Sequence, residues 1–386
     1  MKFKSNTILL VDDEPQILRA LKQELQLLPL GETFRILTCD TTLEAESVLE
    51  ENRGEIFLVI ADLRMPRPNL TGSDFLLKVH ADYPDIVLIL LTAYSDLPEI
   101  QKAVTAGLQA LLFKPWNPEI LHLEIRKARE TFRLRQENRD LQERIRQQLL
   151  TAGEFQRKML TSPEIRSQFA AAEFLYRPLP DYHCGGDYHD ILQLGDQRLL
   201  ILLGDAAGHG IRPALVTAML KVLTAQAVYG NRNPSAADFL TEVNRGLYRV
   251  LENVGDMVVT FTVLLVEPER KMLYMANAGH LPLYLRRNGV WEEIHSQGAA
   301  MGFRPDLVYE ERGMELCRGD RLVLFTDGLT EVQEDQENIG GEKVREVLSD
   351  IPDENLSPGE ICRCFQALHP REEFRDDVTV AVVRIL

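Results

Sequence analysis

The stretch IFLVIADLRMP, residues 56–66, begins as an uninterrupted apolar run and reaches a carboxylate at Asp62. Similar short runs occur at 7–11, 86–91 and 110–113, with a weaker one at 34–37, and amphipathic stretches separate them. Near-continuous apolar strands that alternate with helical patterns are typical of a parallel sheet covered on both faces. We therefore predict an α/β doubly wound domain with a five-stranded parallel sheet over residues 1–120.

Polar side chains occur where four of these runs end. Asp12 and Asp13 follow the first run, and Asp62, Thr92 and Lys114 follow three others. Because the carboxyl ends of parallel strands meet at one edge of the sheet, we expect these side chains to converge. The carboxylates would hold a hard cation such as Mg²⁺, and one of them would accept a phosphoryl group. The lysine would neutralise the developing charge, and the Thr92 hydroxyl would hydrogen-bond a phosphoryl oxygen.

The segments that carry these residues resemble those of response-regulator receiver domains, which sensor histidine kinases phosphorylate in two-component systems. They read VDDEP at 11–15, DLRMP at 62–66, LTAY at 91–94 and FKP at 113–115. The resemblance implies that Asp62 is the phosphoacceptor and that it binds Mg²⁺ together with Asp12 or Asp13. It also implies a cis peptide bond before Pro115.

Two features depart from the usual pattern of that family. Leu111 occupies a position where many receivers carry an aromatic switch residue, which bears on the usual coupling to Thr92. The loop RPNLT at 67–71, beside the acceptor, is longer than is common, which bears on partner docking and on the lifetime of the phosphoryl group.

Residues 121–160 differ in composition from what precedes them. No glycine occurs between Pro118 and Gly153, and charges of both signs alternate with apolar residues, which predicts a long helical linker. One apolar stripe comprises Leu121, Ile125, Ala128 and Phe132. A heptad seam follows at Leu134, Asn138, Leu141, Ile145, Gln148, Ala152, Phe155 and Met159. An amide at seam position Asn138 favours an in-register partner, so we expect a parallel homodimer; the alternative is a single helix packed on its own domains.

Residues 161–386 mix strand-like runs with grouped helical stretches. The strand-like runs are at 198–204, 257–266, 271–277, 282–286, 290–294, 321–326 and 378–385, and the helical patterns at 213–229, 234–251, 341–350 and 358–368. Asn288 and Gly289 predict a hairpin turn between two of the strands. This arrangement is typical of an α+β domain, here two packed antiparallel sheets with helices outside.

Carboxylates recur beside the strands of this region. Asp187 precedes the strand at 198–204 and Asp205 ends it, Asp327 ends another, and Asp376 and Asp377 precede the last. Several carboxylates without a matching set of His or Cys favour Mg²⁺ or Mn²⁺ over zinc. A binuclear site of that kind can activate water and bind a phosphoryl group.

These aspartates lie in segments that resemble PPM-type metal-dependent serine/threonine phosphatases, in particular their bacterial SpoIIE/RsbU-like class. The segments are GGDYHD at 185–190, GDAAGHG at 204–210, NAGH at 277–280, FTDG at 325–328 and RDDVT at 375–379. The resemblance implies an α-β-β-α sandwich that holds two Mn²⁺ or Mg²⁺ ions. It places catalytic metal ligands at Asp187, Asp205, Asp327 and Asp376, adds the carbonyl of Ala206, and makes Asp377 the weaker candidate of its pair.

The same resemblance implies a substrate, a phosphoserine or phosphothreonine on a small anti-sigma-factor antagonist in a partner-switching pathway. We therefore expect phosphorylation of Asp62 to control a phosphatase. The alternative is a phosphorylation-controlled adaptor, or an anti-sigma-type binding protein, with a non-catalytic phosphatase-like domain. All four carboxylates are present, which favours the enzyme. His209 is either a ligand or general acid, or a structural hydrogen-bonding residue.

Composition narrows the class of protein further. The net charge of −16, with no helix-turn-helix pattern after residue 120, argues against a nucleic-acid partner. Five scattered cysteines, an odd number, indicate reduced thiols and a cytoplasmic protein. No stretch approaches 18 uncharged apolar residues and the N-terminus has no signal-peptide pattern, so we expect no membrane span.

Overall fold

A computed structural model of the chain describes residues 6–27, 34–65, 70–93, 100–101, 104–105, 107–160, 169–180, 182–195, 197–255, 257–331, 339–368 and 374–386. The chain separates into two compact units, Met1–Arg144 and Ile145–Leu386. The predicted loop at 67–71 lies largely outside the described residues, as does Tyr94 of the LTAY segment.

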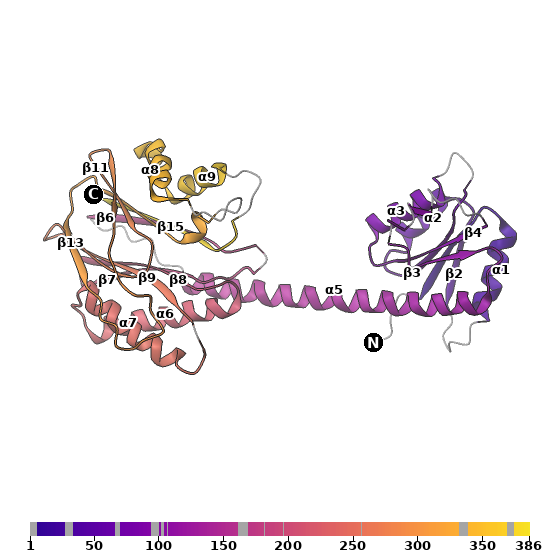
Figure 1. The fold of residues 1–386 in the computed structure, drawn as a ribbon, viewed down its shortest axis with the longest axis horizontal. Helices are drawn as coiled ribbons and strands as arrows, with labels where there is room; N and C mark the ends of the chain where they lie inside the picture. Colours follow the sequence, from indigo (N-terminus) through magenta and orange to yellow (C-terminus); the bar gives the residue numbers. More distant parts are fainter. Residues whose placement is uncertain are drawn as a thin grey trace. The chain divides into compact units, whose positions relative to one another are not determined.

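The first unit contains the predicted parallel sheet, in the strand order β2-β1-β3-β4-β5 (Figure 1). Its strands are β1 Thr7–Val11, β2 Arg35–Cys39, β3 Ile56–Asp62, β4 Val87–Thr92 and β5 Ala110–Phe113. Helices α2 (Thr42–Glu51) and α3 (Gly72–Asp82) pack on one face, and α1 (Pro15–Gln26) packs on the other beside the start of α5. The apolar strands are buried because helices cover both faces, so the doubly wound prediction is confirmed.

Helix α5 runs without a break from Pro118 to Leu160. Its first apolar stripe is buried in the core of the first unit, from Leu121 to Phe132. The seam that follows is exposed over its middle part, where Leu141 is 58% exposed and Ile145 49%. The long helix is therefore confirmed, and pairing through its seam stays a prediction.

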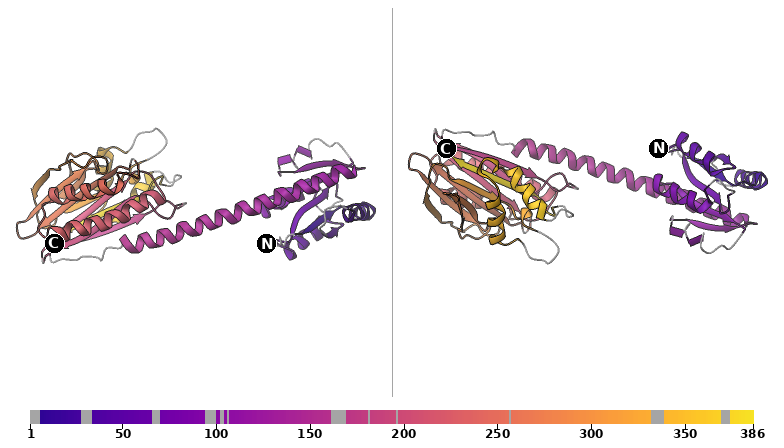
Figure 2. Two further views of the ribbon diagram at one scale, coloured as in Figure 1. Left: turned by 90° about the horizontal axis from the view of Figure 1, so that it is seen from below. Right: turned by 90° about the horizontal axis from the view of Figure 1, so that it is seen from above.

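The second unit is an α-β-β-α sandwich, as predicted. One antiparallel sheet has the order β13-β10-β9-β8-β7 and the other β12-β11-β14-β15-β6. Helices α6 (Ile211–Gly230) and α7 (Ala236–Leu251) cover the first sheet, and α8 (Gly341–Asp350) and α9 (Pro358–Leu368) cover the second. The two views of Figure 2 look onto these helical layers in turn, pink for α6 and α7 and yellow for α8 and α9. Apolar side chains between the sheets form a third core.

The strands of the first sheet are β7 Asp187–Leu194, β8 Arg198–Ala206, β9 Val259–Glu267, β10 Met272–Ala278 and β13 Glu311–Glu315. Those of the second sheet are β6 Ala170–Arg177, β11 Leu283–Arg287, β12 Val290–Ile294, β14 Arg321–Phe325 and β15 Val378–Ile385. Short 3₁₀ helices occur at Asp327–Leu329 (η1) and Asp353–Asn355 (η2). Asn288 and Gly289 form the predicted turn, both with positive φ, at 50° and 81°.

Three strands were not predicted from the sequence: β6, β7 and β13. As a result the position given to Asp187 was wrong, because it does not precede the strand at 198–204 but is the first residue of β7. All three are edge strands, which pair on one side only, so their sequences mix polar and apolar residues and lack a clear pattern.

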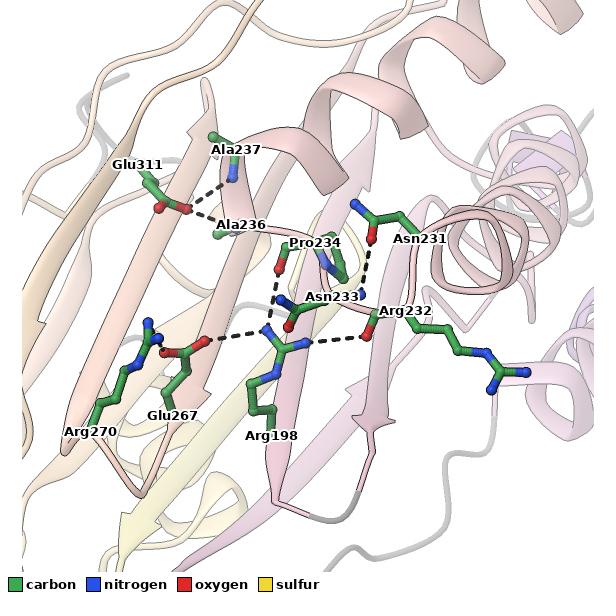
Figure 3. A network of polar contacts seen from close by, with 10 residues as sticks. All are labelled: Arg198, Asn231, Arg232, Asn233, Pro234, Ala236, Ala237, Glu267, Arg270 and Glu311. Carbon is green, nitrogen blue, oxygen red and sulfur yellow. Dashed lines mark hydrogen bonds and ion pairs between the residues drawn. The ribbon is translucent and has the colours of Figure 1, made fainter.

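Arg198, at the start of β8, lies in a polar network that fixes the connection between α6 and α7 (Figure 3). Its guanidinium donates to the carbonyls of Arg232 (3.2 Å) and Pro234 (3.5 Å) and to a carboxylate oxygen of Glu267 (3.3 Å). The Glu311 carboxylate accepts from the first backbone N–H groups of α7. This network lies at the opposite end of β8 from Asp205, and it holds the helical layer on the sheet.

Within the described residues, α6 is the one helix long and apolar enough, by length and composition, to cross a membrane. One of its faces, which includes Val216 and Leu220, is buried in the core shared with the first sheet.

Candidate functional sites

The first site lies at the carboxyl edge of the parallel sheet. The Nζ atom of Lys114 is 2.7 Å from Oδ2 of Asp12 and 2.7 Å from Oδ1 of Asp62. Thr92 is buried at the end of β4, and its carbonyl accepts from the backbone N–H of Lys114 at 2.8 Å. Asp13 is exposed. The structure thus joins Asp12, Asp62 and Lys114 directly and leaves Asp13 at the surface.

Backbone groups orient both buried carboxylates of this site. The N–H of Glu14 donates to Asp12 (3.0 Å) and that of Arg64 to Asp62 (2.8 Å). Burial raises the pKa of Asp12, although the hydrogen bond from Lys114 opposes the shift. Burial also lowers the pKa of Lys114, but its hydrogen bonds to Asp12 and Asp62 outweigh that effect and raise the pKa overall. One lysine is therefore shared by Asp12 and Asp62, with Glu14 farther from it at 3.6 Å.

The other features expected around this site can also be placed. The peptide bond between Lys114 and Pro115 is cis, as predicted. Leu111, at the switch position, is partly buried and packs against the core that α2 and α3 share with the sheet. No aromatic ring is therefore available at that position to couple with Thr92.

The second site lies where the two antiparallel sheets meet. Asp187 on β7 lies directly opposite Asp205 on β8 in the strand register. Asp327 begins η1, directly after Thr326, and Asp376 lies two residues before β15. One oxygen of Asp187 accepts from the hydroxyls of Thr326 (2.9 Å), directly after β14, and Thr379 (2.7 Å) on β15 of the second sheet. Hydrogen bonds across the sandwich thus connect the first-sheet carboxylates to the loops that carry Asp327 and Asp376.

The carboxylates of the second site raise one another's pKa. Burial, then the charges of Asp327 and Asp376, raise the pKa of Asp205 to about 7. Burial, then the charge of Asp205, raise the pKa of Asp187 well above its usual range. In the part of the chain that the structure describes, no Lys or Arg forms an ion pair with Asp187, Asp205, Asp327 or Asp376. Nor do three His, Cys, Asp or Glu side chains of the described residues come close enough to enclose a metal ion.

Asp377 has a different environment from Asp376. Its two oxygens accept backbone N–H groups, from Leu179 at 2.9 Å and from Gly186 at 2.8 Å. A Cβ atom on Gly185 would lie 1.7 Å from the Asp377 carboxylate, so only glycine fits there. Asp377 therefore holds the loop before β7, whereas Asp376 is partly exposed and accepts from the N–H of Asp377.

Two further residues of this region were not assigned a clear role from the sequence. Burial, then the charges of Asp327 and Asp376, raise the pKa of Glu331, which places this carboxylate beside the acidic group. Its position in the same loop, four residues after Asp327, was the available signal. The ring of His209 lies 4.4 Å from that of Tyr182. Burial raises the pKa of both Asp376 and Asp377, and the neighbouring His209 opposes that shift.

Comparison with known families agrees with this two-centre arrangement. The family model described as response regulator receiver domain matches residues 8–126, and the one described as Stage II sporulation protein E (SpoIIE) matches residues 195–386. The chain therefore contains a receiver domain of the response-regulator type followed by a SpoIIE-type domain. The second match contains Asp205, Asp327 and Asp376, and Asp187 lies just before it.

Individual relatives cover each domain. The receiver domain is similar to the hydrogenase transcriptional regulatory protein HoxA of Cupriavidus necator, 37% identical over 131 residues, or 34% of this chain and 25% of HoxA. The phosphoserine phosphatase RsbU of Bacillus subtilis is 25% identical over 255 residues, or 64% of this chain and 72% of RsbU. The chain therefore spans a quarter of the first relative and about seven tenths of the second.

A solved structure supports the fold of the phosphatase domain. The SiaA-PP2C domain of Pseudomonas aeruginosa matches with a TM-score of 0.54 and 24% identity, covering 63% of this chain and 98% of that domain. The likeness shows the sandwich fold.

Proposed function

We propose that this chain is a metal-dependent protein serine/threonine phosphatase whose activity is controlled by phosphorylation of Asp62. The observation that carries the proposal is the group of four carboxylates that no described cationic side chain neutralises. Burying like charges together is costly, and structures retain such groups where a bound cation compensates them. The phosphoserine phosphatase RsbU, matched over most of its length, supports the same activity.

The four carboxylates are donors of the kind that Mg²⁺ or Mn²⁺ prefers, and binding two such ions would draw them closer together than they lie in the structure. Asp187, Asp205, Asp327 and Asp376, with the carbonyl of Ala206, offer only oxygen ligands, which hard cations prefer. When bound, such ions supply Lewis-acid chemistry, which acidifies water and neutralises phosphoryl oxygens. Thr326 and Thr379 orient the Asp187 carboxylate, and Asp377 fixes the loop that leads to it.

In the receiver domain, the Asp62 carboxylate would attack the phosphorus of a phosphohistidine on a sensor histidine kinase. The bond from phosphorus to the Asp62 oxygen forms as the bond to the histidine nitrogen breaks. Lys114 supplies positive charge beside the acceptor, and Thr92 donates its hydroxyl to a phosphoryl oxygen. Asp12, with Asp62 and Asp13, would hold Mg²⁺ at this edge.

For the substrate we propose a phosphorylated anti-sigma-factor antagonist in a partner-switching pathway, in the cytoplasm. Similarity to RsbU supports this proposal. It supports a type of substrate, a phosphoserine or phosphothreonine protein, and not one particular protein. The rival function, an adaptor with a non-catalytic phosphatase-like domain, predicts the loss of metal-binding carboxylates. Asp187, Asp205, Asp327 and Asp376 are all present, so the enzyme is favoured.

We further propose a parallel homodimer through residues 121–160. Leu134, Leu141 and Ile145 are each about half exposed. Pairing of two helices would remove this apolar surface from water, which stabilises the dimer by about 25 cal/mol for each Å² buried. Light scattering should give twice the chain mass of 43.9 kDa. Leu141→Asp combined with Ile145→Asp should yield monomers, whereas a monomeric wild type at micromolar concentration in both phosphorylation states would refute the dimer.

The test of the main proposal is a phosphatase assay on the full chain with a phosphoserine protein substrate and Mn²⁺. We expect metal-dependent release of phosphate, with a rate that changes when acetyl phosphate or beryllofluoride modifies the receiver. Hydrolysis that persists in excess chelator would contradict the metal assignment. Absence of hydrolysis together with tight binding of the antagonist would favour the adaptor.

A further inference from the structure

A cavity of about 670 Å³ opens at the end of the sandwich that lies away from the acidic site. Strand β15 starts two residues after Asp376 and ends at Ile385, which lines the cavity. Its eight residues therefore separate the cavity from the acidic site by roughly 25 Å. The volume lies within the range of about 300 to 1,000 Å³ that is usual for pockets that bind small molecules.

The floor of the cavity is the outer end of the apolar core between the two sheets. Val266 and Leu316 belong to that core and are 1% and 7% exposed. Ile385 packs against the same core, and Phe169 lines the cavity with it. An occupant of the cavity thus contacts apolar side chains, and its own apolar part would leave water on binding.

The rim of the cavity carries more positive than negative charge. Arg270, Lys271 and Arg318 line it, with Glu315 as the one acidic side chain, and all four are exposed. Arg270 forms an ion pair with Glu267 at 3.3 Å, whereas neither Lys271 nor Arg318 forms an ion pair with a described residue. In a chain with a net charge of −16, this local excess of cations favours an anionic occupant.

Backbone hydrogen bonds hold the walls of the cavity in place. The carbonyl of Lys271, in the turn before β10, accepts from the N–H of Leu316 at 2.8 Å. On the other side, the N–H of Gly319 donates to the carbonyl of Ile385 (2.9 Å), and the N–H of Ile385 donates to that of Asp320 (3.0 Å). The cavity is therefore preformed, which lowers the entropic cost of binding.

We propose that this cavity binds a small carboxylate with an apolar chain, of the medium-chain fatty acid class. The chain would lie against Val266, Leu316 and Ile385. The carboxylate would lie between Lys271 and Arg318. An inorganic anion lacks the apolar part, and a neutral or cationic chain lacks the charge. An anionic membrane surface is disfavoured because the net charge of the protein is strongly negative. The site does not depend on the proposed phosphatase activity.

Cys317 gives a direct readout, because it lines the cavity and is the one exposed cysteine of the chain. Of the other four, three are buried and Cys364 is partly exposed. The full chain is treated with iodoacetamide, with and without decanoate below its micelle concentration, and labelling is mapped by mass spectrometry. At a decanoate concentration about 10 times its dissociation constant, alkylation of Cys317 should slow by about 10-fold, while that of Cys364 is unchanged.

Calorimetry with related compounds separates the contribution of the chain from that of the charge. From hexanoate to octanoate to decanoate, the affinity should rise by about 4-fold for each methylene that reaches the floor. Acetate has the charge without the chain, and decylammonium has the chain with the opposite charge. Neither should bind at concentrations that saturate the cavity with decanoate, and neither should protect Cys317.

Charge reversal at the rim tests the position of the carboxylate. Lys271→Glu combined with Arg318→Glu replaces attraction by repulsion and should weaken decanoate binding by about 10-fold. The matched control is Lys158→Glu combined with Arg249→Glu, two exposed cations of the same unit. It changes the net charge equally and should bind decanoate like the wild type. If the first variant does not fold, Lys271→Gln combined with Arg318→Gln takes its place.

Several outcomes would overturn the inference. Decanoate that neither binds nor protects Cys317 would do so, as would equal protection by decylammonium. Equal affinity in the two charge-reversed proteins would show that decanoate binds elsewhere. Protection by a glutamate-rich peptide, or by phosphatidylglycerol vesicles, where decanoate gives none would assign the cavity to a protein or a membrane instead.

Discussion

The receiver and phosphatase domains each gather carboxylates at the ends of strands, but they balance the charge differently. In the receiver, Lys114 lies 2.7 Å from both Asp12 and Asp62, so the chain itself provides the compensating cation. In the phosphatase domain, Asp205 pairs with Asp187 across the strands, and burial followed by the charges of Asp327 and Asp376 raises its pKa. No described Lys or Arg forms an ion pair with it. The first centre includes one lysine beside its acids, whereas no described lysine or arginine pairs with the four acids of the second.

This difference matches the two kinds of chemistry proposed. A phosphoacceptor needs a carboxylate that stays in place between rare phosphorylation events, and a lysine can hold it there. A hydrolytic centre that holds two divalent cations needs more negative charge, and the absence of a resident lysine leaves that charge to the metal ions.

The largest expected effect is at the acceptor. Asp62→Asn removes the nucleophilic oxygen, so acid-labile phosphorylation by acetyl phosphate should be abolished. Asp40→Asn, an exposed aspartate of the same domain, should label like the wild type. Mass spectrometry of the labelled protein locates the phosphoryl group, and its presence on another residue would show that the centre was misidentified.

Next in size is the loss of a metal ligand. Asp205→Asn and Asp327→Asn should each reduce Mn²⁺-dependent hydrolysis by at least about 100-fold, since even residues behind the ligands contribute 10- to 100-fold to metal sites. Removing one of the mutually repelling charges should also stabilise the metal-free protein, by about 1 kcal/mol for Asp205→Asn. Exposed Asp306→Asn is the matched control. Full activity in both variants would remove the proposed centre.

Lys114→Met would make the receiver resemble the phosphatase centre. It leaves Asp12 and Asp62 buried without their cation, so the free energy of unfolding of the receiver should fall by about 3 kcal/mol. Added Mg²⁺ should restore part of that loss and should stabilise the variant more than the wild type. Urea denaturation of the full chain, with exposed Lys127→Met as control, measures both effects. An unchanged unfolding midpoint would contradict the charge balance inferred for the receiver.

The smallest effect concerns His280 in the phosphatase domain. Burial lowers its pKa to about 4, and one ring nitrogen lies 2.8 Å from the hydroxyl of Thr260. The unfolded chain binds a proton at this residue below about pH 6.5, while the folded protein stays unprotonated. The free energy of unfolding should therefore decrease by about 1.4 kcal/mol for each pH unit as the pH falls from 6.5 toward 4.

His280→Gln keeps a hydrogen-bonding group for Thr260 but cannot titrate, so its stability should depend less steeply on pH than that of the wild type. Urea denaturation at pH 5, 6 and 7 provides the comparison. Parallel slopes in the two proteins would mean that His280 does not account for the acid sensitivity.

The sequence was sufficient for the parallel sheet, because β1, β3 and β4 are buried apolar runs and the weaker patterns of β2 and β5 stand between helical stretches. It also named the carboxylates through short segments that resemble known families. The structure places Asp187 opposite Asp205 and joins Asp12 and Asp62 through Lys114, while their catalytic and metal-binding roles stay predictions. The edge strands β6, β7 and β13 escaped, since half of their hydrogen-bonding edge faces no partner and their composition is mixed. The role of Asp377 could not be predicted, because it bonds to Leu179 across 198 positions.

The register that sets Asp187 opposite Asp205 has a consequence for the lifetime of the protein. β7 is an edge strand, and its first residue, Asp187, lies opposite a second acid, Asp205, on β8. Because like charges directly opposite each other destabilise a strand pair, the start of β7 should open at a lower free energy than the apolar part of the strand that follows. Backbone amides at the start of β7 should exchange with solvent faster than those near Leu194. A cation bound by these acids would stabilise the paired state of β7. The concentration of divalent metal would therefore also affect how fast proteases cleave the protein at this strand.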